Sequence, residues 1–404
     1  MRHKNISSPP ATRLYSPRII RWWSVVAVGA GFIGALAVTI RAGLGRVDQW
    51  VLGDWLIDYS AGFTRRGLIG EAVRQGEILF GADRIVVTTV IQVTVVTGLL
   101  GFVLVLALSH ERGLTTLLLV ASPAFVLFLL NPLGTMRKEI LLWLLVAAIL
   151  VWSKSQRVSA GKTIPWVVAI VFPLLVLAHD GLVLYAGFVG VMVWLLVSEG
   201  TVSTSRALWA SSVGGVLTAA AGLASLVWPR RSGTSEDICT TLTGSGYSDA
   251  LCSGAIGFLD QDAAFSVNRV IEAITSGNYL GVYLPVIVLS SLPLFFVRWS
   301  KPMGFALVWA LAFTVPLFVV AIDWGRWIVI SVWLVTMLVL RFDGSPHITV
   351  TPLQKTRRRI FSLLASGGVL AYSVLWSIPH CCEPRIGFGV IDRVSEVVVL
   401  LGLG

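Results

Sequence analysis

The sequence predicts an all-α fold, a polytopic integral membrane bundle of about eleven transmembrane helices. Of the 404 residues, 56% are hydrophobic and only 13% are charged. Apolar runs of about 18 residues or more, which are long enough to cross a bilayer as helices, recur along the whole chain. Because these runs are continuously apolar rather than alternating, they exclude a closed β-barrel. Residues 1–404 are therefore predicted to form a single membrane domain.

The basic residues predict the orientation of this bundle. Much of the net charge of +10 lies in short connections between apolar runs, where positive-inside bias and anionic headgroups explain it without a nucleic-acid partner. Residues 1–19 form a basic tail without a signal-peptide cleavage site, and residues 341–359 form a second strongly basic loop. We expect both to be cytoplasmic, so that the protein is multi-pass with a cytoplasmic N-terminus.

The spans follow from the apolar runs between these connections. The stretch 164–197 is too long to cross a bilayer once, so we expect a hairpin whose outer turn carries His179 and Asp180. The other predicted spans cover 20–40, 85–108, 114–130, 140–152, 207–228, 279–297, 303–322, a segment from Trp327, and 360–378.

The first outer segment, 41–84, contains a charged motif directly after the first span. Its centre reads DWLIDYSAGFTRRGLIG over 54–70. At about 100° per residue on a helix, Asp54, Asp58 and Arg65 fall on one stripe. We therefore expect a juxtamembrane outer helix, which apolar residues such as Trp55 and Leu56 anchor in lipid.

The second outer segment, 229–278, is the longest polar loop. It carries Arg230, Arg231, Cys239 and Cys252, and a disulfide between the two cysteines is expected only if the loop faces an oxidising compartment. No cysteine has partners at zinc-ligand spacing, and no glycine-rich nucleotide loop follows a strand. The sequence therefore predicts neither a metal nor a cofactor.

Charged residues gather at the predicted outer ends of the spans, where positive-inside bias should deplete arginine. Three separate outer segments carry arginine near an acid, and ionisable groups at membrane depth are functional candidates. Guanidinium groups bind phosphate oxygens bidentately and stay charged at low dielectric. The candidates for binding the phosphates of a lipid-linked donor are Arg65, Arg66, Arg137, Lys138 and Arg326.

Four further residues are candidates for catalysis. A carboxylate or histidine near the phosphates can accept a proton from an attacking sugar hydroxyl, and Asp58 and His179 are the candidates for that role. Asp180 or Asp323 would orient them. Simpler interpretations remain open: a local ion pair between Asp323 and Arg326, a hairpin cap at the His179–Asp180 turn, and topogenic cations at 137–138.

These motifs resemble the polytopic glycosyltransferases of the GT-C superfamily, in particular the EpsG/Wzy-type polysaccharide polymerases. The likeness consists of many spans, an acidic motif after the first span, an outer Arg137-Lys138 before a span, and an outer His179-Asp180 turn. It implies transfer of glycans at the outer leaflet from polyprenyl diphosphate or phosphate, with outer arginines on the diphosphate. Residues 229–278 contain no histidine, unlike the late outer loop of O-antigen ligases, and no soluble outer domain is present.

The sequence therefore predicts an extracytoplasmic-face glycosyltransferase or polysaccharide polymerase of cell-envelope or exopolysaccharide biosynthesis, in the bacterial inner membrane. The predicted partners are the lipid bilayer, a polyprenyl-phosphate-linked glycan and other polysaccharide-assembly membrane proteins. A transporter or flippase of a lipid-linked glycan is the first alternative, although it should carry charges at mid-span. A non-catalytic scaffold for envelope assembly is the second alternative.

Overall fold

The computed structural model describes residues 17–43, 49–110, 114–130, 136–227, 233–297, 299–342, 367–379 and scattered positions after 385. Within these ranges the chain forms helices and no strand, which confirms the all-helical class. Most of the basic tail and of the 341–359 loop lies outside the described residues, as do Arg230, Arg231 and the first part of the predicted last span.

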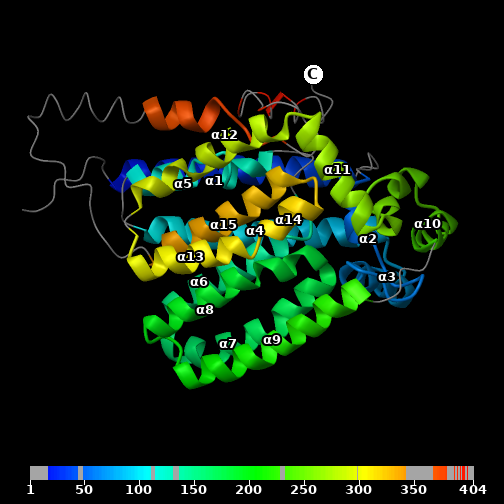
Figure 1. Cartoon of the computed structure of the whole chain (residues 1–404), viewed down its shortest axis with the longest axis horizontal. Coiled ribbons are helices and arrows are strands. Elements are labelled where there is room, and N and C mark those ends of the chain that lie inside the picture. The colour runs from blue at the N-terminus through cyan, green and yellow to red at the C-terminus, as the bar shows by residue number, and fades with distance from the viewer. Residues whose placement is uncertain are drawn as a thin grey trace, which may run out of the picture.

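Long helices lie side by side and form the bundle (Figure 1). Several of them are interrupted or followed by short 3₁₀ turns, among them η2 (Asp180–Tyr185) and η5 (Leu292–Phe296). The bundle helices are α1 (Pro17–Gly43), α4 (Arg84–Ser109), α6 (Ile140–Ser155), α7 (Arg157–Ala178), α8 (Ala186–Ser198), α9 (Thr204–Val227), α12 (Tyr279–Ser291), α13 (Lys301–Ala312), α14 (Val315–Val320) and α15 (Trp324–Phe342).

Seven helical segments among the described residues are long and apolar enough to cross a membrane, and two shorter apolar helices accompany them. The bundle is therefore that of a multi-pass membrane protein in a lipid bilayer, whereas the predicted count of eleven spans stays a prediction. Helix α15 lies at the centre, since 89% of its apolar window is buried against 28% to 56% for the other six. Its first turn is consequently fixed inside the bundle.

The predicted span 114–130 is not one helix. Helix α5 (Leu114–Val120) ends before Pro123, and the chain resumes as the 3₁₀ turn η1 (Val126–Leu130). Proline lacks a backbone donor and disfavours helical geometry at the preceding residue. The break lies within the protein, where η1 packs against α1, and irregular backbone is tolerated at membrane depth under that condition.

The predicted juxtamembrane helix over 54–70 is also wrong in its extent. Helix α2 (Val51–Leu56) stops after six residues, and α3 (Leu68–Phe80) follows a stretch of turns and bends. Asp54, Asp58 and Arg65 therefore do not share one helical stripe. The expected lipid anchors Trp55 and Leu56 are fully buried in the protein, so they pack inside it instead.

A helical cap covers the end of the bundle where α2 and α3 lie (Figure 1). The predicted long loop forms α10 (Thr234–Gly244), α11 (Ala263–Thr275) and the 3₁₀ turns η3 (Asp249–Ser253) and η4 (Gly257–Asp260). A disulfide joins Cys239 to Cys252 across a Cα separation of 5.7 Å. The cap has a hydrophobic core of its own, to which α2, α3, α10 and η4 contribute Leu52, Leu56, Val73, Ile238, Leu242 and Leu259.

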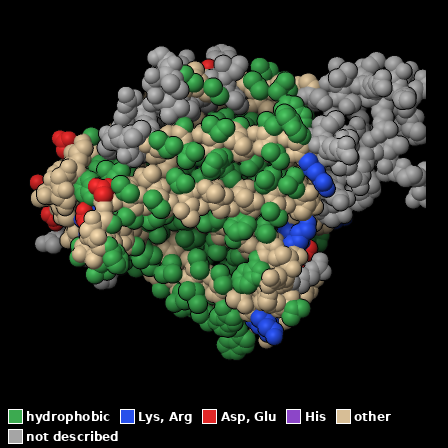
Figure 2. Space-filling view, turned by 180° about the vertical axis from the view of Figure 1, so that it is seen from behind, with side chains coloured by type: hydrophobic (Ala, Val, Ile, Leu, Met, Phe, Trp, Pro, Cys, Tyr) green, Lys and Arg blue, Asp and Glu red, His purple; other side chains and the backbone are tan. Residues whose placement is uncertain are grey.

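The two ends of the bundle differ in charge. Figure 2 shows a broad hydrophobic surface between an end that carries Asp and Glu side chains and an end that carries Lys and Arg. The exposed acids of the cap are Glu236, Asp237, Asp249, Asp260, Asp262 and Glu272. The basic residues at the opposite helix ends are Lys154, Lys162, Arg206, Lys301 and Arg341.

Candidate functional site

Four segments that are distant in sequence meet beneath the cap. They are α2 with the connection that follows it, the residues just before α6, the junction of α7 with η2, and the start of α15 with the residue before it. Their charged side chains form what we call the charge cluster: Asp54, Arg65, Arg66, Arg137, Lys138, Glu139, His179, Asp180, Asp323 and Arg326.

Glu139 is the centre of the buried part of the charge cluster. Its Oε1 lies 3.1 Å from His179 Nε2 and 3.2 Å from Arg326 Nε. The Arg326 guanidinium also reaches Asp323 Oδ2 at 3.1 Å and lies over the Trp327 ring. Burial opposes ionisation of Glu139, but the charges of Arg326 and His179 outweigh it and hold the pKa of Glu139 well below its ordinary value.

Asp180 joins the cluster to the α2–α3 connection. Its Oδ1 lies 2.7 Å from Arg66 Nε, and its Oδ2 lies 3.8 Å from Arg65 Nη1. These three side chains retain 20% to 24% exposure, whereas Glu139 and His179 are buried. The cluster therefore has an accessible rim of two arginines and one carboxylate above an enclosed base.

The segments that carry the cluster include unusual backbone, and the cluster contains an unsatisfied carboxylate. Arg66 has a φ of 67° and Met136 a φ of 63°, a left-handed conformation that side chains disfavour and that concentrates at functional sites. The Arg66 carbonyl accepts from Lys138 Nζ. Both carboxylate oxygens of Asp54 are buried and accept no hydrogen bond from the described residues. Burial opposes the charge of Arg66, but Asp180 and then Asp54 raise its pKa.

Lys138 and Arg137 are enclosed cations of different kinds. Burial lowers the pKa of Lys138 to about 8, so its ammonium titrates near neutral pH. Burial and the positive charge of Arg326 also lower the pKa of Arg137. Within the described part of the chain, Arg137 makes neither a hydrogen bond nor an ion pair, and its guanidinium lies 5.6 Å from the Trp50 ring centroid.

Asp58 belongs to a different set of contacts, which we call the anchor network: Asp58, Glu77, Arg84 and Tyr247. Arg84 donates to Asp58 Oδ2 at 2.9 Å and to Glu77, and Tyr247 donates to Glu77 Oε1 at 2.9 Å. Asp58 Oδ1 accepts from the backbone and the hydroxyl of Ser60. These contacts join α3 and α4 to the cap.

The structure brings together eight of the nine residues predicted for the site and leaves out Asp58. Sequence reasoning gave Glu139 and Asp54 no catalytic or phosphate-binding role. Glu139 had a visible signal, because it directly follows Arg137 and Lys138 at the start of an apolar helix. Arg65 has a second contact, since its Nη2 donates to the carbonyls of Phe258 and Leu259 in η4, which ties the rim to the cap.

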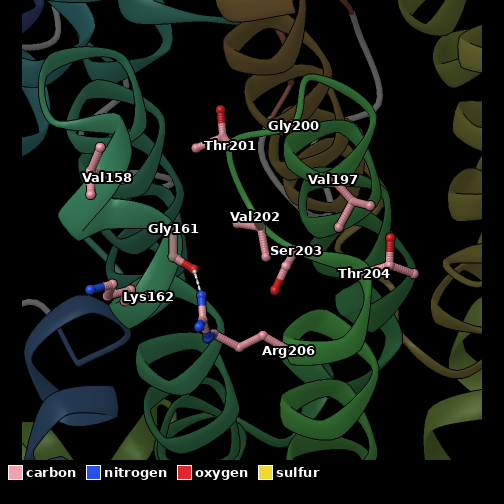
Figure 3. Close-up of a pocket in the computed structure, with 10 residues that line it drawn as sticks. All are labelled: Val158, Gly161, Lys162, Val197, Gly200, Thr201, Val202, Ser203, Thr204 and Arg206. Carbon is pink, nitrogen blue, oxygen red and sulfur yellow. Dashed lines mark hydrogen bonds between the residues drawn. The ribbon is translucent and has the colours of Figure 1, made fainter.

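A cavity of about 500 Å³ lies at the opposite, basic end of the bundle (Figure 3). It opens between α7 and the start of α9, and Arg206 donates to the Gly161 carbonyl beside it. No member of the charge cluster lines this cavity. Among the described residues, no group of three His, Cys, Asp or Glu side chains is placed to hold a metal ion.

Comparison of the chain with protein-family models, with curated proteins and with solved structures finds no match.

Proposed function

We propose that this protein is a membrane glycosyltransferase or polysaccharide polymerase that transfers a glycan from a polyprenyl-(di)phosphate-linked donor. The observation that carries the proposal is the charge cluster, in which four distant segments present two partly exposed arginines beside carboxylates and a histidine. Buried charges are costly, and their gathering at one end of a membrane bundle indicates a site.

The proposed side is the extracytoplasmic face of the bacterial inner membrane, with the N-terminus in the cytoplasm. The basic helix ends opposite the cap support this orientation through positive-inside bias. The disulfide between Cys239 and Cys252 supports an oxidising compartment for the cap. A lipid-linked donor fits this side, because nucleotide sugars are not expected there.

Arg65 and Arg66 would bind the donor phosphates, since guanidinium groups match phosphate oxygens bidentately. In the transfer step, the acceptor hydroxyl oxygen bonds to the anomeric carbon while the bond from that carbon to the phosphate oxygen breaks. The negative charge that develops on the leaving phosphate is stabilised by the arginines. The hydroxyl proton passes to a carboxylate.

The exposure of each side chain favours particular roles in this step. Asp180 and Asp323 retain 20% and 16% exposure, so either can meet an acceptor hydroxyl. His179 is fully buried against Glu139, which suits a positioning role better than the proton transfer predicted from sequence. Asp58 has no part in the proposed mechanism, because its oxygens are engaged by Arg84 and Ser60.

The flippase alternative is less well supported. The described spans keep their charged residues near their ends, as with Lys154, Lys162 and Arg341 at one end of the bundle and Arg326 at the other. A path for a charged headgroup would require polar groups at mid-span.

The proposal is tested with purified protein in liposomes and a polyprenyl-diphosphate-linked oligosaccharide. Arg66→Gln should reduce glycan transfer by about 100-fold or more, the scale expected for losing one charged stabiliser of a transition state. Arg74→Gln is the matched control, since Arg74 is equally accessible but pairs with Glu71 outside the cluster. Equal transfer by both variants would contradict the proposal. Movement of the lipid across the bilayer without bond formation would support the flippase instead.

A further inference from the structure

The carboxylate of Asp180 pairs with Arg65 and Arg66, the two side chains that the proposed function assigns to the donor phosphates. Its two oxygens face Arg66 and Arg65 separately, at 2.7 Å and 3.8 Å. A carboxylate and a phosphate present the same kind of paired anionic oxygens to guanidinium groups. Because the three side chains are about one fifth exposed, a competing anion can reach them from solvent.

We propose that Asp180 is a built-in competitor for the donor diphosphate. Asp180 holds Arg65 and Arg66 when the site is empty, the diphosphate displaces it on binding, and the released carboxylate then accepts the proton of the acceptor hydroxyl. This inference rests on the proposed function, because it assigns the diphosphate to these arginines. The proton acceptor is thus freed only when a donor is present.

Asp180 has other partners when it leaves the arginines. Its Oδ1 accepts from the Gly181 backbone amide at 3.0 Å and lies 3.9 Å from His179 Nδ1. Both partners are local to Asp180 and independent of the two arginines. Asp323 differs, because its partner Arg326 is buried and is also held by Glu139. The pairs of Asp180 with the two arginines are consequently more accessible to an incoming anion than the pair of Asp323 with Arg326.

The buried cation Arg137 favours binding of an anion at the charge cluster. Arg137 is 5% exposed and, among the described residues, is paired with no carboxylate. Burial and then the repulsion from Arg326 lower its pKa, and the smaller contributions of nearby acids offset them only in part. A diphosphate carries more negative charge than one carboxylate, so it would offset this repulsion as well as bind the two rim arginines.

The experiment measures binding of inorganic pyrophosphate to the detergent-purified full chain by isothermal titration calorimetry. Asp180→Asn should bind pyrophosphate about 10-fold more tightly than wild type, because the amide keeps the size but loses the competing charge. Asp323→Asn is the matched control, which removes a carboxylate of similar exposure from the same cluster, and its gain should stay within about threefold. Asp180→Glu keeps the charge and should bind no more tightly than wild type.

The possible results distinguish failure of the competitor inference from failure of the proposed phosphate site. Unchanged affinity in Asp180→Asn, or an equal gain in Asp323→Asn, would overturn the competitor inference while wild-type binding still supports a phosphate site. Absence of pyrophosphate binding in the wild type and in all variants would contradict the phosphate site on which the proposed function depends. A gain confined to Asp180→Asn supports the inference.

Discussion

The anchor network and the charge cluster are two buried ionic groups that lie near each other and differ in how completely they are bonded. In the anchor network, Arg84 donates to two carboxylates, and Asp58 accepts from Arg84 and twice from Ser60. In the charge cluster, neither carboxylate oxygen of Asp54 and neither of Glu139 accepts a hydrogen bond of good geometry from any residue that the structure describes.

This difference separates a structural role from a functional one. A fully bonded polar network rigidifies the fold, whereas an incompletely bonded one costs free energy and is retained where a site requires it. The left-handed backbone of Arg66 and Met136 adds to that cost in the charge cluster. We therefore expect variants of the anchor network to change stability and variants of the charge cluster to change activity.

The largest loss of stability is expected for Arg84→Met. Arg84 is 3% exposed and pairs with Asp58 and Glu77, so its removal leaves two carboxylates without their cation. The free energy of unfolding should fall by about 3–5 kcal/mol, measured by thermal unfolding in detergent. Arg269→Met, which breaks an exposed pair with Glu272, is the control and should cost about 1 kcal/mol or less. Equal losses of unfolding free energy in the two variants would contradict a structural role for the anchor network.

Glu139→Gln should have a smaller effect on stability and a large effect on transfer. The variant keeps the side-chain volume but removes the charge that orients His179 and Arg326, while Arg326 retains Asp323. We expect transfer to fall by about 100-fold with a stability loss clearly below that of Arg84→Met. A stability loss as large as that of Arg84→Met would place Glu139 among the structural residues.

The smallest expected effect is a pH dependence due to Lys138. Its pKa is lowered from 10.5 to about 8, so between these values the unfolded chain binds a proton that the folded protein has released. The free energy of unfolding contributed by this group therefore rises with pH across that window. Lys138→Met should flatten the rise by about 2 kcal/mol relative to wild type, measured by unfolding at pH 8 and pH 10. Identical pH profiles would contradict the lowered pKa.

The sequence predicted the class of fold and the end of the bundle at which the charges meet. The length of the apolar runs was enough to place most spans. The positions of Arg66, His179 and Arg326 relative to those spans predicted that all three lie on the same side of the membrane. Prediction from the sequence failed where tertiary packing overrode local pattern. The turn after Leu56 ended the expected helix, and Asp58 was engaged by Arg84, a residue that reads in the sequence only as the start of a span.

The most direct test of the central claim compares Asp54→Asn with Asp58→Asn. Both aspartates are fully buried and lie four residues apart, so the two variants make the same chemical change in opposite bonding environments. We predict that Asp58→Asn lowers the free energy of unfolding by about 2–3 kcal/mol and keeps transfer per folded molecule. Asp54→Asn should stay within about 1 kcal/mol of wild type and lose transfer by about 10-fold. Equal destabilisation by the two variants, or full transfer by Asp54→Asn, would contradict the account.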